Sequence, residues 1–356
     1  MVFVINELAQ YHETLKETNR KRKSNIKQVI HFAKQSNTNM RSLFIPVLLS
    51  AFAQLYSQTS DDLKIKDVIA RNRVKNQINW DYKYVGNKPE KNGVKTSITN
   101  YSRNGDILQV DAFNPKGAVL HTEKYSYDSK GNKTEYNRKS GENSYQKKYT
   151  YNQKNQLTEE SGFDGVENFR NIYTYNDSGE MSEIRYMKKS VLQEKRVFVK
   201  ENASTQVSVY NSAGALTSRL VLKYDTKGNL VEEAVYGLNQ SELEKKTYQY
   251  DDKKNLKEEA RYKLDKITLK TTYKYNTSGA LLEIQEEAPG VARFVKKSLS
   301  YDDKGNLIEI QWRRKGTEEF NRISYQYDKR GLCISADTYY PATKYRVLTK
   351  YSYEYY

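Results

Sequence analysis

The eleven residues Leu299–Glu309, L-S-Y-D-D-K-G-N-L-I-E, recur along this chain of 356 residues. Close copies are Leu222–Glu232, L-K-Y-D-T-K-G-N-L-V-E, and Tyr125–Glu135, Y-S-Y-D-S-K-G-N-K-T-E. The tyrosine before the aspartate returns every 24 to 26 residues from Tyr101 to Tyr353, and Val199 replaces it once. A fixed period of this length is typical of repeat proteins. The sequence therefore predicts an array of about ten units over residues 98–356.

The motif Y-D-x-x-G-N-L has the chemistry of a β-hairpin turn. An Asp or Asn at its start accepts hydrogen bonds from later main-chain N–H groups, and the Gly adopts positive φ without steric cost. A type I turn followed by a left-handed Gly gives a hairpin with a bulge. Asn155, Ala203 and Lys254 replace the Gly, and we expect the Ala203 turn to be the most irregular. The predicted turn glycines are Gly105, Gly131, Gly179, Gly228, Gly279, Gly305 and Gly331.

The residues on both sides of each turn are mostly Tyr, Val, Ile, Thr and Leu, which favour β-strands. In the best-defined unit this turn places Tyr301 opposite Leu307, and Leu299 opposite Glu309, with all four side chains on one face. The unit at Tyr250 predicts the same pattern, with Tyr248 opposite Glu258. A second, more variable turn leads to the next unit. We therefore expect an all-β, antiparallel hairpin meander that forms a long, twisted and curved sheet.

The recurring Y-D-x-x-G-N-L resembles the YD repeat of Rhs and teneurin-type proteins over roughly residues 98–356. The resemblance implies hairpins laid side by side into a strip that coils, sometimes into a closed shell. Large Rhs proteins also carry a D-P-x-G-type self-cleaving segment and a C-terminal toxin. The sequence shows neither, so we expect a short exported form built as an open curved strip.

The N-terminal residues differ from the array. Arg41 after Met40, the apolar run Leu43–Leu55 and A-F-A at 51–53 have the pattern of a signal peptide over 40–53, with cleavage between Ala53 and Gln54. The run is too short for a stable membrane span. Residues 1–39 are then a mis-annotated or unstructured extension, and 54–97 cap the array. A signal with a long n-region and an uncleaved anchor are the alternatives.

The formal net charge is +16, of which residues 1–53 hold +5. In the array, positive and negative charges alternate along the strands. This favours cross-strand Lys–Glu pairs over a polyanion site, and we expect no nucleic-acid partner. Trp312, Arg313 and Arg314 form the one basic cluster beside an aromatic residue and are a candidate ligand surface. The tyrosines form a packed face, or a row of rings that stacks on sugars.

Few residues are suited to catalysis. His121 is the one histidine of the array, and Cys333 occupies a position where other units have Leu, so we expect a buried hydrophobic role for it. A catalytic carboxylate pair should be unique. The candidate glutamates instead recur in nearly every unit: Glu135, Glu159, Glu183, Glu232, Glu258, Glu283 and Glu309. The sequence predicts a protein without catalytic activity, cofactor or metal.

Together these features predict an exported binding or scaffold protein of the bacterial envelope, secreted, periplasmic or at the cell surface. Its expected partners are glycans or another envelope protein. The first alternative is a structural or adhesive protein that contacts another protein through an unpaired sheet edge. The second is a glycan-active enzyme, in which changing one Glu to Gln abolishes turnover.

Overall fold

The computed structural model describes residues 60–356 in two units, which divide between Arg73 and Val74. The predicted extension 1–39, the signal peptide 40–53 and the cleavage site Ala53–Gln54 lie outside the described residues. The first unit contributes helix α3 (Ser60–Arg71), which ends where Arg73 takes φ 53° and its N–H bonds to the carbonyl of Ala70. A residue with positive φ is a common helix terminator.

The second unit is one antiparallel β-sheet in which almost every strand pairs with the strands before and after it. A 3₁₀ turn, Pro341–Thr343, connects the last two strands. The strands are β1 Val74–Val85, β2 Lys88–Pro89, β3 Val94–Tyr101, β4 Ile107–Phe113, β5 Val119–Tyr127, β6 Lys133–Ser140, β7 Asn143–Tyr151, β8 Leu157–Phe163, β9 Asn168–Tyr175, β10 Met181–Lys188, β11 Val191–Glu201, β12 Ser204–Asn211, β13 Leu216–Tyr224, β14 Leu230–Tyr236, β15 Glu242–Tyr250, β16 Leu256–Lys263, β17 Lys266–Tyr275, β18 Leu281–Ala288, β19 Val291–Tyr301, β20 Leu307–Trp312, β21 Asn321–Tyr327, β22 Cys333–Tyr340 and β23 Tyr345–Tyr355.

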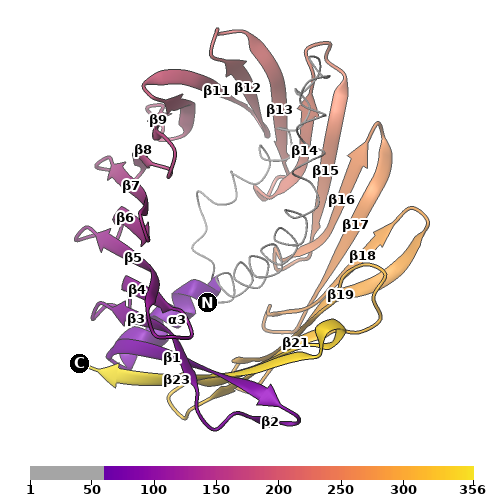
Figure 1. The fold of residues 1–356 in the computed structure, drawn as a ribbon. Helices are drawn as coiled ribbons and strands as arrows, with labels where there is room; N and C mark the ends of the chain where they lie inside the picture. Colours follow the sequence, from indigo (N-terminus) through magenta and orange to yellow (C-terminus); the bar gives the residue numbers. More distant parts are fainter. Residues whose placement is uncertain (1–59) are drawn as a thin grey trace, which may run out of the picture. The chain divides into compact units, whose positions relative to one another are not determined.

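The sheet closes on itself. Strand β1 pairs with β3 over six residues and with the last strand, β23, over nine, from Val74↔Tyr355 to Lys83↔Val347. The two-residue strand β2 pairs only with β1, which leaves a closed barrel of 22 strands among the 23. Figure 1 shows the ring, with β1 in indigo beside β23 in yellow. The prediction of an antiparallel meander is confirmed, but the open strip is wrong. Closure pairs the main-chain groups that two free edges would expose.

The turns that contain the repeated motif share one geometry. In the unit that starts at Leu299, the N–H of Gly305 bonds to the carbonyl of Asp302, and the N–H of Asp302 bonds to the carbonyl of Asn306, both at 2.9 Å. The side chain of Asn306 donates to Asp302 Oδ2 at 2.8 Å, which explains why Asn follows the Gly. The seven turn glycines have φ between 79° and 84°, and Asn155 and Lys254 have φ 65°.

The turn at Ala203 is built differently. Glu201 pairs directly with Ser204, so only Asn202 and Ala203 connect β11 to β12, and Asn202 rather than Ala203 has positive φ, 50°. We expected this turn to be the most irregular, but the pairing of β11 with β12 contains no register shift, whereas the other motif hairpins each contain one. Ala203 therefore does not occupy the position of the turn glycine.

The strand register differs from the prediction at one position in each hairpin. Tyr301 pairs with Leu307, and Tyr250 with Leu256, as predicted. Glu309, however, pairs with Ser300 and not with Leu299, and Glu258 pairs with Gln249 and not with Tyr248. A second bulge after the turn adds one residue and moves the Glu to the other face of the sheet. The prediction that Tyr and Glu share a face is therefore wrong.

The barrel wall accordingly has two distinct faces. The tyrosine face carries the motif tyrosines and most of the buried apolar residues, among them Ile184, Val207 and Ile323. The glutamate face carries the repeated glutamates together with Ser, Thr and Lys. The barrel also has two ends. We call the end with the motif turns the motif end, and the opposite end, with the other turns, the variable end.

Candidate functional site

The seam where the barrel closes brings together polar side chains from five strands on the glutamate face. Asp337 lies on β22, Arg346 on β23 and Tyr84 on β1. Arg346 holds the carboxylate with two hydrogen bonds, Nε to Oδ1 at 2.9 Å and an NH2 bond to Oδ2 at 2.6 Å. The hydroxyl of Tyr84 donates to Oδ2 at 2.9 Å, and the guanidinium of Arg346 lies 4.3 Å from the centre of the Tyr84 ring.

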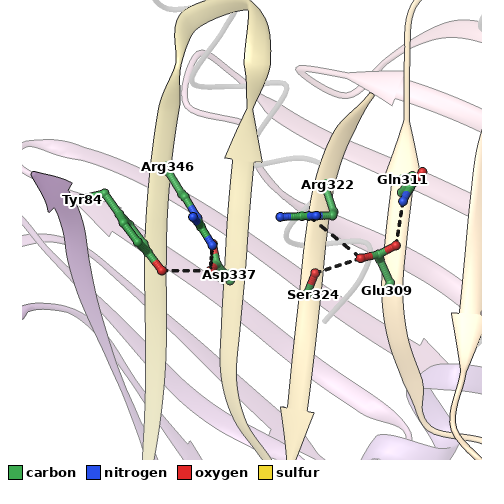
Figure 2. Close-up of polar contacts among 7 residues, drawn as sticks. All are labelled: Tyr84, Glu309, Gln311, Arg322, Ser324, Asp337 and Arg346. Carbon is green, nitrogen blue, oxygen red and sulfur yellow. Dashed lines mark hydrogen bonds and ion pairs between the residues drawn. The ribbon is translucent and has the colours of Figure 1, made fainter. Parts of the chain in front are cut away.

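A second group of polar residues lies beside the first on β20 and β21 (Figure 2). Glu309 accepts hydrogen bonds from Gln311 Nε2 at 2.7 Å and from Ser324 Oγ at 3.1 Å. Arg322 Nε lies 4.0 Å from the Glu309 carboxylate, and that nitrogen is buried without a hydrogen-bond partner. The two groups are adjacent, because Ser324 pairs with Glu309 on one side and with Asp337 on the other. We call these seven residues the seam cluster: Tyr84, Glu309, Gln311, Arg322, Ser324, Asp337 and Arg346.

The charges of the seam cluster favour binding over proton transfer. Burial alone would raise the pKa of Asp337, but hydrogen bonds from Arg346 and Tyr84, with the nearby charge of Arg322, hold that pKa below its ordinary value. Burial and the bond to Asp337 raise the pKa of Tyr84. A general acid needs a carboxyl pKa raised toward neutral pH. Asp337 is therefore a fixed hydrogen-bond acceptor at neutral pH.

Of the seam cluster, only Glu309 was predicted from the sequence as a candidate residue. Tyr84 and Asp337 are 253 positions apart, and Tyr84 lies on a strand that lacks the motif. Asp337 also stands outside the repeat, because the position equivalent to Glu309 in its unit is Ser335. Only the pairing of β1 with β23 brings Tyr84 to Asp337.

The predicted ligand residues lie at the variable end of β20. Trp312 packs edge-on against Tyr340, with ring centres 5.9 Å apart, and Tyr340 contacts Tyr345. Arg313 Nε donates to the carbonyl of Val295 on β19 at 2.9 Å, and its guanidinium lies 4.7 Å from the ring of Phe320 in its own loop. The Arg314 carbonyl accepts a bond from the Thr317 hydroxyl at 2.8 Å. Trp312 therefore packs in a group of tyrosine rings, and the guanidinium of Arg313 is held by contacts with β19 and with its own loop.

The repeated glutamates lie on the glutamate face, and each has a polar partner. Lys270 contacts Glu258 at 2.7 Å, Lys274 contacts Glu283 at 2.6 Å and Arg170 contacts Glu159 at 2.7 Å. The remaining partners are Gln146 for Glu135, Arg185 for Glu183, Lys223 for Glu232 and the seam residues for Glu309. Six of these glutamates contact a neighbouring strand, Glu309 through Ser324, whereas Glu183–Arg185 and Glu309–Gln311 are contacts within one strand.

His121 and Cys333 both lie on the tyrosine face. His121 Nε2 is 3.7 Å from Glu123 Oε1, and burial lowers the pKa of the imidazole. Burial raises the pKa of the Cys333 thiol to about 12, and its Sγ contacts the carbonyl of Ser335 at 3.4 Å. Within residues 60–356, no three His, Cys, Asp or Glu residues are grouped so as to hold a metal ion. No helix in that part of the chain is long and apolar enough to cross a membrane.

Comparisons with known proteins give no family for this chain. No family model matches it, and no curated protein matches it. Among solved structures, the toxin complex TcdB2-TccC3-TEV is similar at 13% identity, over 72% of this chain and 16% of that one, with a TM-score of 0.27. A porin-like protein from Bacteroides uniformis is similar at 11% identity, over 79% of this chain and 98% of that one, with a TM-score of 0.29. The chain therefore spans about a sixth of the length of the toxin-complex chain.

Proposed function

We propose that this chain is an exported, non-catalytic, YD-repeat-like protein of the bacterial envelope whose seam cluster binds a carbohydrate. The observation that carries this proposal is the fixed array of two carboxylates and two guanidiniums around Ser324. Sugars present pairs of hydroxyls, which planar polar side chains bind by donating and accepting hydrogen bonds in fixed directions. The array provides both kinds of group, and the side chain of Arg322 is 43% exposed, although its Nε is buried.

Aromatic rings border the same surface. On the glutamate face, Tyr82 pairs with Leu348 on β23, next to the Leu348↔Asp337 pair. Lys350 lies 4.9 Å from the centre of the Tyr82 ring. Rings beside a few oriented polar groups are typical of small-molecule sites. This combination supports a saccharide better than an extended polyanion, because the local carboxylates would repel the latter.

Closure of the barrel argues against the first alternative, a structural or adhesive protein that binds another protein. That function depended on an unpaired sheet edge, and in the barrel each of the 22 ring strands has a partner on both sides. The enzymatic alternative depended on one singular glutamate. The low pKa of Asp337 and the paired state of Glu309 support binding without turnover.

A glycan array with the full-length chain tests the proposal, followed by titration calorimetry with any saccharide that binds. Arg322→Ala and Asp337→Asn should each weaken binding at least about tenfold, since each removes a charge-assisted hydrogen bond. Arg170→Ala is the matched control, because it breaks the same kind of pair with a repeated glutamate away from the seam. Absence of binding to any saccharide overturns the carbohydrate proposal, and release of a shortened glycan overturns the non-catalytic one.

Export is tested separately by the N-terminus of the protein from its native cell. Cleavage by a signal peptidase predicts an intact mass that begins at Gln54. An intact mass that begins at Met1 would contradict export through residues 40–53.

A further inference from the structure

The variable end of the barrel carries exposed apolar side chains at the tips of separate turns. Among the described barrel residues, six large apolar side chains are at least 57% exposed, and all six lie at this end. At the motif end, the most exposed large apolar residue is Val199, at 44%. The six are Val85 at 69%, Val119 at 57%, Val166 at 84%, Val191 at 58%, Leu238 at 68% and Leu264 at 72%.

The turn at Leu264 shows that an apolar tip is present where turn chemistry disfavours it. Leu264 and Asp265 have φ 48° and 59°, and they connect the paired residues Lys263 and Lys266. Two successive residues with positive φ favour Asn and Gly, whereas a Leu there carries a steric cost. The Leu264 side chain is nevertheless exposed, so burial of its apolar surface does not offset this steric cost.

Exposed lysines flank three of the six apolar tips. Lys88 pairs with Val85 across the β1–β2 turn, Lys116 lies in the turn just before Val119, and Lys263 and Lys266 flank Leu264. All four lysines are exposed. Acids also lie beside the tips, but they contact lysines: Asp265, next to Leu264, lies 3.4 Å from Lys245 Nζ, and Asp164 and Glu167, which flank Val166, contact Lys188. The four exposed lysines therefore make the exposed charge around Val85, Val119 and Leu264 net positive.

The wall of the barrel does not offer lipids a continuous apolar band of its own. The tyrosine face contains the ion pair Lys147–Glu160 at 2.6 Å, and the glutamate face contains Lys274–Glu283 at 2.6 Å. A barrel that spans a membrane needs one apolar face about 25 Å tall. The most exposed apolar groups in the described barrel are those at the tips of the variable end.

We propose that the variable end docks on an anionic lipid surface, with the apolar tips inserted at the headgroup level and the flanking lysines against anionic headgroups. Single apolar side chains on separate turns around a rim suit a broad surface, and lysines beside them favour negative charge. A contiguous protein interface would instead need one well-packed apolar patch. This inference does not depend on saccharide binding, because the seam cluster is formed by strand residues of the wall.

Vesicle sedimentation of the full-length chain tests the proposal, with phosphatidylcholine vesicles that contain or lack one quarter phosphatidylglycerol. The triple variant Val166→Ser, Leu238→Ser and Leu264→Asn should lower the fraction bound to anionic vesicles at least about tenfold. Leu264→Asn relieves a positive-φ position, and the side chains of all three residues are exposed, so the melting temperature should not fall. The matched control, Val199→Ser with Ile107→Ser, removes apolar groups at the motif end and should bind as the wild type does.

A local probe separates this rim from other parts of the chain that could bind lipid. In a Cys333→Ala background, an environment-sensitive dye on Val166→Cys should shift to the blue when anionic vesicles are added, and the same dye on Val199→Cys should not. Equal shifts at the two positions, or no shift at 166, would overturn the proposal. A shift at 166 that depends on protein concentration without vesicles would show self-association instead, and would also overturn it.

Discussion

The hydroxyl of Tyr301 donates a hydrogen bond of 3.0 Å to the main-chain oxygen of Leu281 in the preceding hairpin. Seven further motif tyrosines make the same bond, always to the residue two positions after the turn residue with positive φ. These bonds link each hairpin to the one before it. They join Tyr127 to Ile107, Tyr151 to Lys133, Tyr175 to Leu157, Tyr250 to Leu230, Tyr275 to Leu256, Tyr327 to Leu307 and Tyr353 to Cys333, at 2.6 to 3.0 Å.

Removing the hydroxyl of Tyr301 should therefore weaken the contact between two repeats. Tyr301→Phe keeps the ring but leaves the Leu281 carbonyl without this donor, and we expect a loss of about 1 kcal/mol in the free energy of unfolding. Urea denaturation measures it. Tyr145→Phe is the control, because Tyr145 contacts Tyr136 and Lys147 through its ring. A Tyr301→Phe protein as stable as wild type would show that the hydroxyl contributes nothing.

The residue at the positive-φ position of the motif turn should set the stability of each hairpin. Gly305→Ala places a Cβ at φ 79° and should cost about 1 to 2 kcal/mol. Lys254→Gly removes a Cβ from φ 65° and should raise the melting temperature. Calorimetry on the two variants measures opposite shifts. Shifts of the same sign would contradict the role assigned to this position.

The Arg346–Asp337 pair at the seam should make stability depend on pH. Because the pKa of Asp337 is lowered in the folded protein, its contribution is present above the unfolded pKa of about 3.8 and is lost as pH falls through the folded value. Arg346→Gln should cost about 1 to 2 kcal/mol at pH 7 and much less at pH 3. Denaturation at both values checks this. An equal cost at pH 7 and pH 3 would argue against an ionised Asp337 at neutral pH.

The thiol of Cys333 should be unreactive in the folded protein. Its pKa of about 12 leaves almost no thiolate at pH 8, and the thiolate is the reactive form. Alkylation followed by mass spectrometry should find Cys333 unmodified in native protein and fully modified in urea. Rapid labelling of the native protein would contradict the burial of this side chain.

The repeated motif predicted the local structure well, because the turn chemistry of Asp302, Gly305 and Asn306 acts within five residues. The face of Glu309 was not predictable, since it depends on a second bulge at Ile308 for which the strand sequence carries no turn residue. The tyrosine-to-carbonyl bonds were also missed, because the sequence shows a Tyr in either case and does not tell whether its hydroxyl donates a hydrogen bond.

Closure of the barrel was the largest error. Strand β1 lacks the motif, and its pairing with β23 joins residues about 270 positions apart, such as Asp81 and Thr349. The twist accumulated over all the intervening hairpins decides whether these two strands meet, and no local pattern encodes that sum. The contact of Tyr84 with Asp337 depends on the same event, whereas the other six residues of the seam cluster lie on the consecutive strands β20 to β23.

Disulfide formation at the seam tests closure most directly. In a Cys333→Ala background, Asp81→Cys with Thr349→Cys places two thiols on paired residues of β1 and β23, whose own side chains bond at 2.7 Å. The control, Ser298→Cys with Gln311→Cys, joins β19 to β20, which pair in an open or a closed meander. Closure predicts intramolecular disulfides in both proteins under mild oxidation. A disulfide in the control but none between residues 81 and 349 would show an open sheet and contradict the account.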